Sequence, residues 1–244
     1  MKNTISNNVE MWGEKHHWVK DGDEWSGQAE SCNVPYQEWK QSVVDEFLAP
    51  AIRSDMNVLE IAPGHGRWSE QILYFCKNLI LVDLNQSCID VCKKKFSSWK
   101  SVEYIVTDGK SLPGILDSSV DFVWSYDSFV HMESDVILAY FREIQRVLKP
   151  SGRAVIHHAG RNHKTLWLGF LRQAGAIPRD LYRRLSMGSS SDNDGWRSNV
   201  SPELIANLAE QAGLQLESQV RFWGKNDRYG VPRFNDVISS LTRP

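Results

Sequence analysis

The sequence predicts an α/β fold with a doubly wound, mostly parallel seven-stranded sheet. Short runs of apolar, partly β-branched residues, typical of buried strands, alternate with segments in which apolar residues recur at helical spacing. The last two runs are expected to form a hairpin-like pair with one antiparallel strand. The seven predicted strands lie near residues 58–61, 79–82, 102–106, 120–125, 154–158, 214–223 and 234–241.

The first predicted strand leads directly into a glycine turn. Pro63 has no N–H and ends the strand, and Gly64 and Gly66 allow a tight turn with a bare backbone. From Arg67 the spacing becomes helical, with Trp68 on the apolar side. A strand, a glycine turn and a helix start in this order predict a nucleotide-sized binding site.

The charge around this turn distinguishes between two ligands. Ser69 stands where a dinucleotide-binding turn has its third glycine, and the carboxylate of Glu60 would repel a pyrophosphate. Asp83 follows the second strand, where a carboxylate accepts hydrogen bonds from a ribose diol, and Asp108 follows the third. Three acids around one turn favour a cationic ligand, so S-adenosylmethionine fits better than NAD.

Five motifs in succession resemble those of class I S-adenosylmethionine-dependent methyltransferases. They are E-I-A-P-G-H-G at 60–66, L-V-D-L at 81–84, T-D-G at 107–109, V-D-F-V-W-S at 120–125, and a helix with an L-K-P-S-G turn at 141–152. Ala62 and Pro63 stand where that family more often has an early glycine. The resemblance covers about residues 36–158 and implies a Rossmann-like methyltransferase fold, the cofactor S-adenosylmethionine and methyltransferase activity.

The cofactor-binding residues are predicted from these motifs and from the helix that starts after Pro35, which in the family closes over the cofactor. They are Tyr36, Trp39, Glu60, Ala62, Gly64, Gly66, Trp68, Asp83, Leu84, Asp108, Gly109, Ser125 and Tyr126.

Candidate catalytic residues follow the fourth and fifth strands. Methyl transfer needs the attacking atom held close to the methyl carbon, and a hydroxyl acceptor also needs help to lose its proton. His131 and His158 are the predicted bases, with Asp127 orienting a histidine or binding a cofactor hydroxyl. Side chains alternate along a strand, so one of His157 and His158 is expected to point into the core or to the opposite face. A divalent cation held by Asp127 and a histidine is an alternative but is not expected, and no metal ligand is predicted.

Two segments are predicted to cover the site. Residues 1–34 contain Trp12 and Trp18 and are too aromatic for a disordered tail, so they are predicted to form a cap; a strap packed outside the core is the alternative. Residues 159–200 interrupt the alternation and are predicted to form a substrate lid after the fifth strand. No linker divides the chain, so residues 1–244 are predicted to be one domain.

The cap and the lid supply the predicted substrate-binding residues, Trp12, Trp18, Trp196 and Arg197. Flat aromatic surface suits a sugar ring or an aromatic molecule. Arg197 either binds an acidic substrate group or pairs with a surface acid.

The length, net charge and hydropathy of the chain argue against several classes of partner. With 244 residues and a net charge of −2, it lacks the basic face that nucleic-acid binding usually needs. No apolar run approaches the roughly 18 residues of a membrane span. The first residues do not resemble a signal peptide. We therefore expect a cytoplasmic monomer or homodimer without nucleic-acid or membrane partners.

The leading functional hypothesis is methyl transfer from S-adenosylmethionine to a hydroxyl of a small molecule or saccharide. Two alternatives remain open: an N-methyltransferase acting on a small molecule, and a protein that binds S-adenosylmethionine without catalysis.

Overall fold

The computed structural model describes most of the chain. The described residues are 3–16, 18, 26–161, 167, 170–171, 174–176, 178, 181 and 197–244. Trp196, residues 19–25 of the predicted cap and most of the predicted lid lie outside the described residues.

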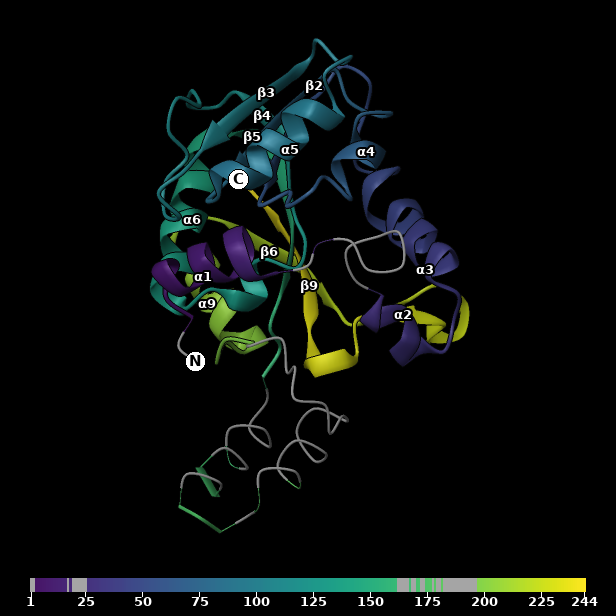
Figure 1. The fold of residues 1–244 in the computed structure, drawn as a ribbon, viewed down its shortest axis with the longest axis vertical. Coiled ribbons are helices and arrows are strands. Elements are labelled where there is room, and N and C mark those ends of the chain that lie inside the picture. The colour runs from purple at the N-terminus through teal and green to yellow at the C-terminus, as the bar shows by residue number, and fades with distance from the viewer. Residues whose placement is uncertain are drawn as a thin grey trace.

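A seven-stranded sheet runs through the centre of the molecule in the order β3-β2-β1-β4-β5-β9-β6 (Figure 1). Strands β1 to β5 pair in parallel, whereas β9 is antiparallel to both β5 and β6. This topology confirms the predicted doubly wound, mostly parallel sheet. The strands are β1 (Asn57–Ile61), β2 (Asn78–Asp83), β3 (Val102–Val106), β4 (Val120–Ser125), β5 (Leu148–His158), β6 (Gln215–Val220) and β9 (Val237–Thr242), with β7 (Phe222–Trp223) and β8 (Tyr229–Gly230) forming a separate pair.

Helices cover both faces of the sheet, over two hydrophobic cores. One core holds residues of α3, α4 and α5, and the other holds residues of α6 and α9. The helices are α1 (Ile5–Glu10), α2 (Gly27–Cys32), α3 (Tyr36–Val43), α4 (Ser69–Ile72), α5 (Gln86–Lys95), α6 (Ser134–Val147) and α9 (Pro202–Gln211). Shorter helical turns are η1 (Met11–Lys15), η2 (Val44–Leu48), η3 (Phe129–His131), η4 (Lys225–Asp227) and η5 (Arg233–Asn235). No helix in the described ranges is long and apolar enough to cross a membrane.

Local sequence signals explain where several helices begin. The Ser201 side chain accepts a hydrogen bond from the Leu204 N–H (3.2 Å), and Pro202 occupies the first turn of α9. Helix α3 begins directly after Pro35 and continues into η2, which ends just before Pro50. Both helices lie where the sequence predicts them.

Three segments differ from the prediction. Helix α4 has four residues, much shorter than the helical spacing from Arg67 suggests. The predicted L-K-P-S-G turn at 148–152 lies within β5, in which Leu148 pairs with Val120 before the register shifts. The run 214–223 is divided between β6 and β7, which belong to different sheets.

Candidate cofactor and substrate site

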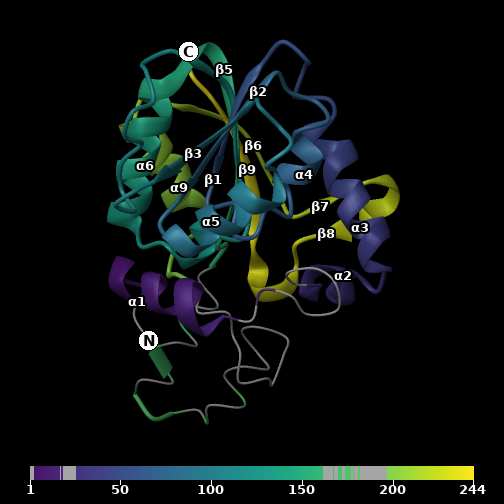
Figure 2. The ribbon, with the colours of Figure 1, turned by 45° about the horizontal axis from the view of Figure 1, so that its top comes forward.

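The predicted site lies at the carboxyl edge of the parallel strands. Ligands of open α/β sheets bind at this edge, near the point where the strand order reverses. Here the reversal lies between β1 and β4, which are neighbours in the sheet. Figure 2 shows α1 lying beyond one end of the sheet, at the end away from the C-terminus.

Asp83 ends β2 and ties two parts of the edge together. One of its carboxylate oxygens accepts a hydrogen bond from the Gly64 N–H (3.2 Å), and the other accepts from the Asn85 N–H (2.8 Å). The side chain is buried, so its negative charge lies between the glycine turn and the start of α5. The structure therefore brings Asp83 and the glycine turn into contact, as the motifs predict.

Both glycines of the turn adopt positive φ angles and lie against an aromatic ring. Ala62, Gly64 and Gly66 all have positive φ angles, of 58°, 57° and 80°. A Cβ atom at Gly66 would lie 2.6 Å from the Phe96 ring, and one at Gly64 would lie 2.3 Å from the Trp18 ring. Ala62 adopts the left-handed conformation with a side chain, which costs about 1 kcal/mol.

A small apolar cavity lies beside this turn, beneath α1. It has about 40 Å³ of free space. Its lining contains the predicted residues Ala62, Leu84 and Gly109, together with Asn3, Ile5, Asn8, Val82, Met132, Val136 and Tyr140. The structure thus brings predicted cofactor residues from three successive strand ends to one space.

Three other predicted cofactor residues make hydrogen bonds within the protein at this edge. Glu60 is buried and accepts a hydrogen bond from the Ser69 hydroxyl (2.5 Å). The Ser125 hydroxyl donates to the Ile61 carbonyl (2.8 Å), which joins the ends of β1 and β4. Asp108 is exposed, and one of its carboxylate oxygens accepts hydrogen bonds within its own turn, from the N–H groups of residues 110 and 111. These hydrogen bonds lower the pKa of Asp108.

Four predicted aromatic residues belong to a buried cluster. The structure places Trp39 in the core instead of at the cofactor site, with its indole N–H donating to the Gly230 carbonyl (2.9 Å). Tyr36 stacks on Trp39 with ring centroids 6.2 Å apart. Trp68 packs against Tyr126 at 5.1 Å, and both are buried. None of the four lines the cavity.

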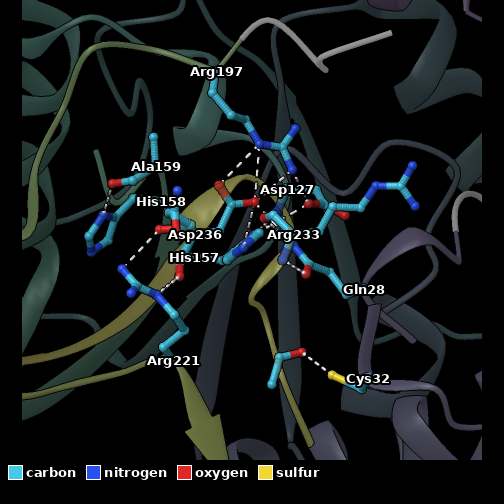
Figure 3. Close-up of polar contacts among 12 residues, drawn as sticks. Gln28, Cys32, Asp127, His157, His158, Ala159, Arg197, Arg221, Arg233 and Asp236 are labelled. Carbon is cyan, nitrogen blue, oxygen red and sulfur yellow. Dashed lines mark hydrogen bonds and ion pairs between the residues drawn. The ribbon is translucent and has the colours of Figure 1, made fainter. Parts of the chain in front are cut away.

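A buried cluster of charges lies at the ends of β4 and β5 (Figure 3). Arg67 donates a hydrogen bond to the Asp127 carboxylate (2.8 Å), and Nδ1 of His157 lies 3.3 Å from the same carboxylate. Nε2 of His157 lies 3.4 Å from Asp236. His157 was not predicted as a site residue, although strand alternation required one of the two adjacent histidines to differ from the other.

Arg197 is held in this cluster. Its guanidinium makes a short ion pair with Asp236 (2.7 Å) and lies over the Phe234 ring, 4.6 Å from its centroid. Gln28 also donates to Asp236 (3.1 Å). The structure therefore assigns the Arg197 guanidinium to an internal ion pair, in place of the predicted contact with an acidic substrate group.

The charges in the cluster shift the pKa values of its members. Burial alone would raise the pKa of Asp127, but the hydrogen bond with His157 and the charges of Arg67 and Arg197 hold it well below its usual range. Burial alone would lower the pKa of His157, but the carboxylates of Asp127 and Asp236 raise it. Asp127 is therefore ionised at neutral pH and is a poor proton acceptor, although its carboxylate can accept hydrogen bonds.

His158 points away from the cluster, and this corrects its predicted role as a base. Its Nδ1 lies 2.7 Å from the Ala159 carbonyl oxygen, and its Nε2 lies 2.7 Å from the Ser239 hydroxyl (Figure 3). Burial lowers the pKa of His158 to about 4. With both ring nitrogens engaged inside the protein, His158 does not reach an acceptor at the edge.

His131 lies at the edge, next to the N-terminal residues. Its ring centroid is 4.7 Å from that of Trp12, and its carbonyl oxygen accepts a hydrogen bond from the Asn8 side chain (3.0 Å). Trp18 stacks on His65 at 4.6 Å. Among the predicted substrate residues, Trp12 and Trp18 therefore lie at the site. In the part of the chain that the structure describes, no three metal-binding side chains are grouped as a metal site would require.

Comparison with known proteins agrees with this architecture. Residues 59–156 match a family model described as a methyltransferase domain. The chain is 30% identical over 111 residues to the biotin biosynthesis bifunctional protein BioHC of Cellvibrio japonicus, covering 46% of this chain and 21% of that protein. It is also 30% identical over 125 residues to an uncharacterised methyltransferase of Schizosaccharomyces pombe, covering 51% of this chain and 46% of that protein. The chain thus matches less than half the length of either relative.

Two solved structures show the same fold at low sequence identity. The [4+2]-cyclase SpnF superposes with a TM-score of 0.63 at 15% identity, covering 99% of this chain and 90% of that chain. The N-methyltransferase NodS of Bradyrhizobium japonicum, in complex with S-adenosyl-L-homocysteine, superposes with a TM-score of 0.59 at 15% identity, covering all of both chains. The chain has the Rossmann-like methyltransferase fold.

Proposed function

We propose that this protein is an S-adenosylmethionine-dependent methyltransferase that methylates a hydroxyl group of a small molecule or saccharide. The observation that carries the proposal is the contact between Asp83 and Gly64, which joins the end of β2 to the glycine turn. The match of residues 59–156 to a methyltransferase domain supports the reaction class.

The residues at the edge fit this cofactor. The buried carboxylate of Asp83 can accept hydrogen bonds from ribose hydroxyls. Gly64 has no side chain of its own over the turn, and the apolar lining at Leu84 and Gly109 would suit a purine ring once the Ile5 side chain moves. When bound, S-adenosylmethionine supplies an electrophilic methyl group on a positively charged sulfur.

His131 is the proposed base for a hydroxyl acceptor. An alcohol does not ionise near neutral pH, so its proton must be removed as the new bond forms. His131 lies at the carboxyl edge, next to Trp12. Asp127, held ionised by Arg67 and His157, would accept a hydrogen bond from the acceptor and orient it.

An amine acceptor is the second candidate, and the charge of Asp127 favours it. The Asp127 side chain is 20% exposed, so its carboxylate can accept a hydrogen bond from the N–H of a neutral amine. The fold shared with the N-methyltransferase NodS is consistent with either acceptor. An amine needs no base once it is deprotonated, so this reaction would not depend on His131.

Transfer of a labelled methyl group from S-adenosylmethionine to panels of small hydroxyl and amine compounds tests the proposal. We expect turnover with a hydroxyl compound, and a fall in kcat of about 100-fold or more in His131→Asn. Turnover with amines alone, unchanged in His131→Asn, would favour the second candidate. Asp127→Asn should mainly raise KM for either acceptor, since it removes a positioning contact.

A further inference from the structure

The N-terminal residues contact several segments of the edge at which the cofactor is proposed to bind. We name residues Asn3–His16 together with Trp18 the N-terminal strap. Ile5 packs on Gly109, since a Cβ atom there would lie 3.3 Å from the Ile5 side chain. Gly13 lies against Asn85, at the start of α5, and Asn8 donates a hydrogen bond to the His131 carbonyl.

Trp18 covers the glycine turn itself. Its ring would lie 2.3 Å from a Cβ atom on Gly64, so no atom of a ligand fits between the indole and the turn. The same ring stacks on His65, in the middle of the turn, at 4.6 Å. The indole N–H donates to the Trp12 carbonyl (3.0 Å), which connects this contact to the rest of the strap.

Ile5 and Trp18 occupy space that the proposed cofactor would need at Gly109 and Gly64. The cavity bounded by Ile5 and Asn8 is small, about 40 Å³. A purine ring beside Gly109 and Leu84 would have to displace the Ile5 side chain. The strap and the cofactor therefore compete for the same surface.

The strap is built in a way that allows it to move. Helix α1 has six residues and none of them is fully buried. A helix of this length is marginal without tertiary contacts. Segments with few buried apolar contacts open at a lower free-energy cost than the core.

We propose that the N-terminal strap is autoinhibitory: in the free protein it occupies the cofactor surface at Gly64 and Gly109, and it must move away before the cofactor binds. This inference rests on the proposed function, because it assumes that S-adenosylmethionine binds at this edge. An autoinhibitory strap lowers the affinity for the cofactor, whereas a cap that folds over the bound cofactor raises it. The apparent dissociation constant equals the intrinsic one divided by the fraction of open protein, so weakening the strap should tighten binding.

The test is calorimetric titration of S-adenosyl-L-homocysteine into four proteins: wild type, Trp18→Ala, Ile5→Ala and the control Trp99→Ala. Trp99 is partly exposed on the surface and packs against Tyr74, so its loss removes an indole without touching the strap. We expect Trp18→Ala to lower the Kd about tenfold, Ile5→Ala to lower it by less, and Trp99→Ala to leave it unchanged. Ile5→Ala keeps the test valid if Trp18→Ala folds poorly.

Hydrogen exchange of the wild-type protein supplies a second readout. Saturation with S-adenosyl-L-homocysteine should speed exchange of the backbone amides of Ile5–Lys15, because the displaced strap loses its contacts. Slower exchange of these amides, or a Kd that rises or stays the same in both strap variants, would overturn autoinhibition while leaving the proposed function intact. Failure of all four proteins to bind would instead contradict the proposed function, and autoinhibition with it.

Discussion

Asp236 shows what a single buried charge contributes to this protein. Its carboxylate binds Arg197, His157 and Gln28 away from solvent. Removing one partner of such a pair leaves the other charge buried and uncompensated, which typically costs about 3–5 kcal/mol. The ion pair of Glu38 with Arg228 has similar geometry (2.7 Å) but lies at the surface.

These two pairs provide a matched prediction. We expect Asp236→Asn to lower the free energy of unfolding by about 3–5 kcal/mol, and Glu38→Gln to lower it far less. Urea denaturation at pH 7 measures both. Equal losses in the two variants would mean that the buried pair adds nothing beyond a surface contact.

His158 makes stability depend on pH within a defined window. Its pKa is about 4 in the folded protein, and about 6.5 in an unfolded chain. Well above pH 6.5 the His158 ring is neutral in both states, so its titration does not reduce the free energy of unfolding. As the pH falls from 6.5 towards 4, the unfolded chain takes up a proton that the folded protein does not, so stability falls by up to about 3 kcal/mol.

Comparing wild type with His158→Asn isolates this effect. The two proteins share every other titratable residue, so the difference in their unfolding free energies reports on His158. We expect wild type to lose about 2 kcal/mol more than His158→Asn between pH 7 and pH 4.5. Parallel pH profiles would show that His158 is not held neutral by burial.

At the scale of elements, the glycine turn contains a residue, Gly66, whose φ angle and close neighbour both disfavour a side chain. Gly66 and Gly114 have similar φ angles, 80° and 77°, but only Gly66 has a neighbour against it, the Phe96 ring. Comparing alanine substitutions at Gly66 and Gly114 therefore separates the cost of backbone strain from the cost of a steric clash with Phe96.

We expect Gly114→Ala to cost about 1 kcal/mol through strain alone, and Gly66→Ala to cost about 1–3 kcal/mol more because Phe96 must shift. Thermal unfolding of both variants measures the difference. If the two variants lose the same stability, the Phe96 ring yields freely and packing does not require glycine at position 66.

Secondary structure was predictable to the extent that periodicity determines it. The apolar runs identified the sheet, and Ser201 with Pro202 identified the start of α9. Periodicity does not determine how far a helix propagates, so α4 is shorter than its pattern suggests. It also does not show which strands pair, and the division of residues 214–223 between two sheets depends on the partners of β6 and β7.

The site was predictable only where a motif constrains the backbone. Asp83 and Gly64 follow strand ends directly, so their proximity was implied by the order of motifs. The roles of His158 and Arg197 depended on distant partners, Ser239 and Asp236, which no local pattern reveals.

For the molecule as a whole, the sheet and its two cores form a scaffold, and the parts proposed to bind ligands lie at one edge. The charge cluster of Asp127, His157 and Asp236 connects the ends of β4 and β5 to the segment just before β9. The N-terminal strap covers the opposite part of that edge, over Gly64 and Gly109. In the proposed reaction, access to the glycine turn would thus depend on the N-terminal strap of the same chain.

The central claim is that this edge binds S-adenosylmethionine and its product. Calorimetry with S-adenosyl-L-homocysteine, and with NAD as the comparison, tests it most directly, using wild type and the Trp18→Ala variant so that a closed strap does not conceal the site. We expect saturable binding of S-adenosyl-L-homocysteine at one site per chain and no heat with NAD. Absence of heat with S-adenosyl-L-homocysteine in both proteins would contradict it.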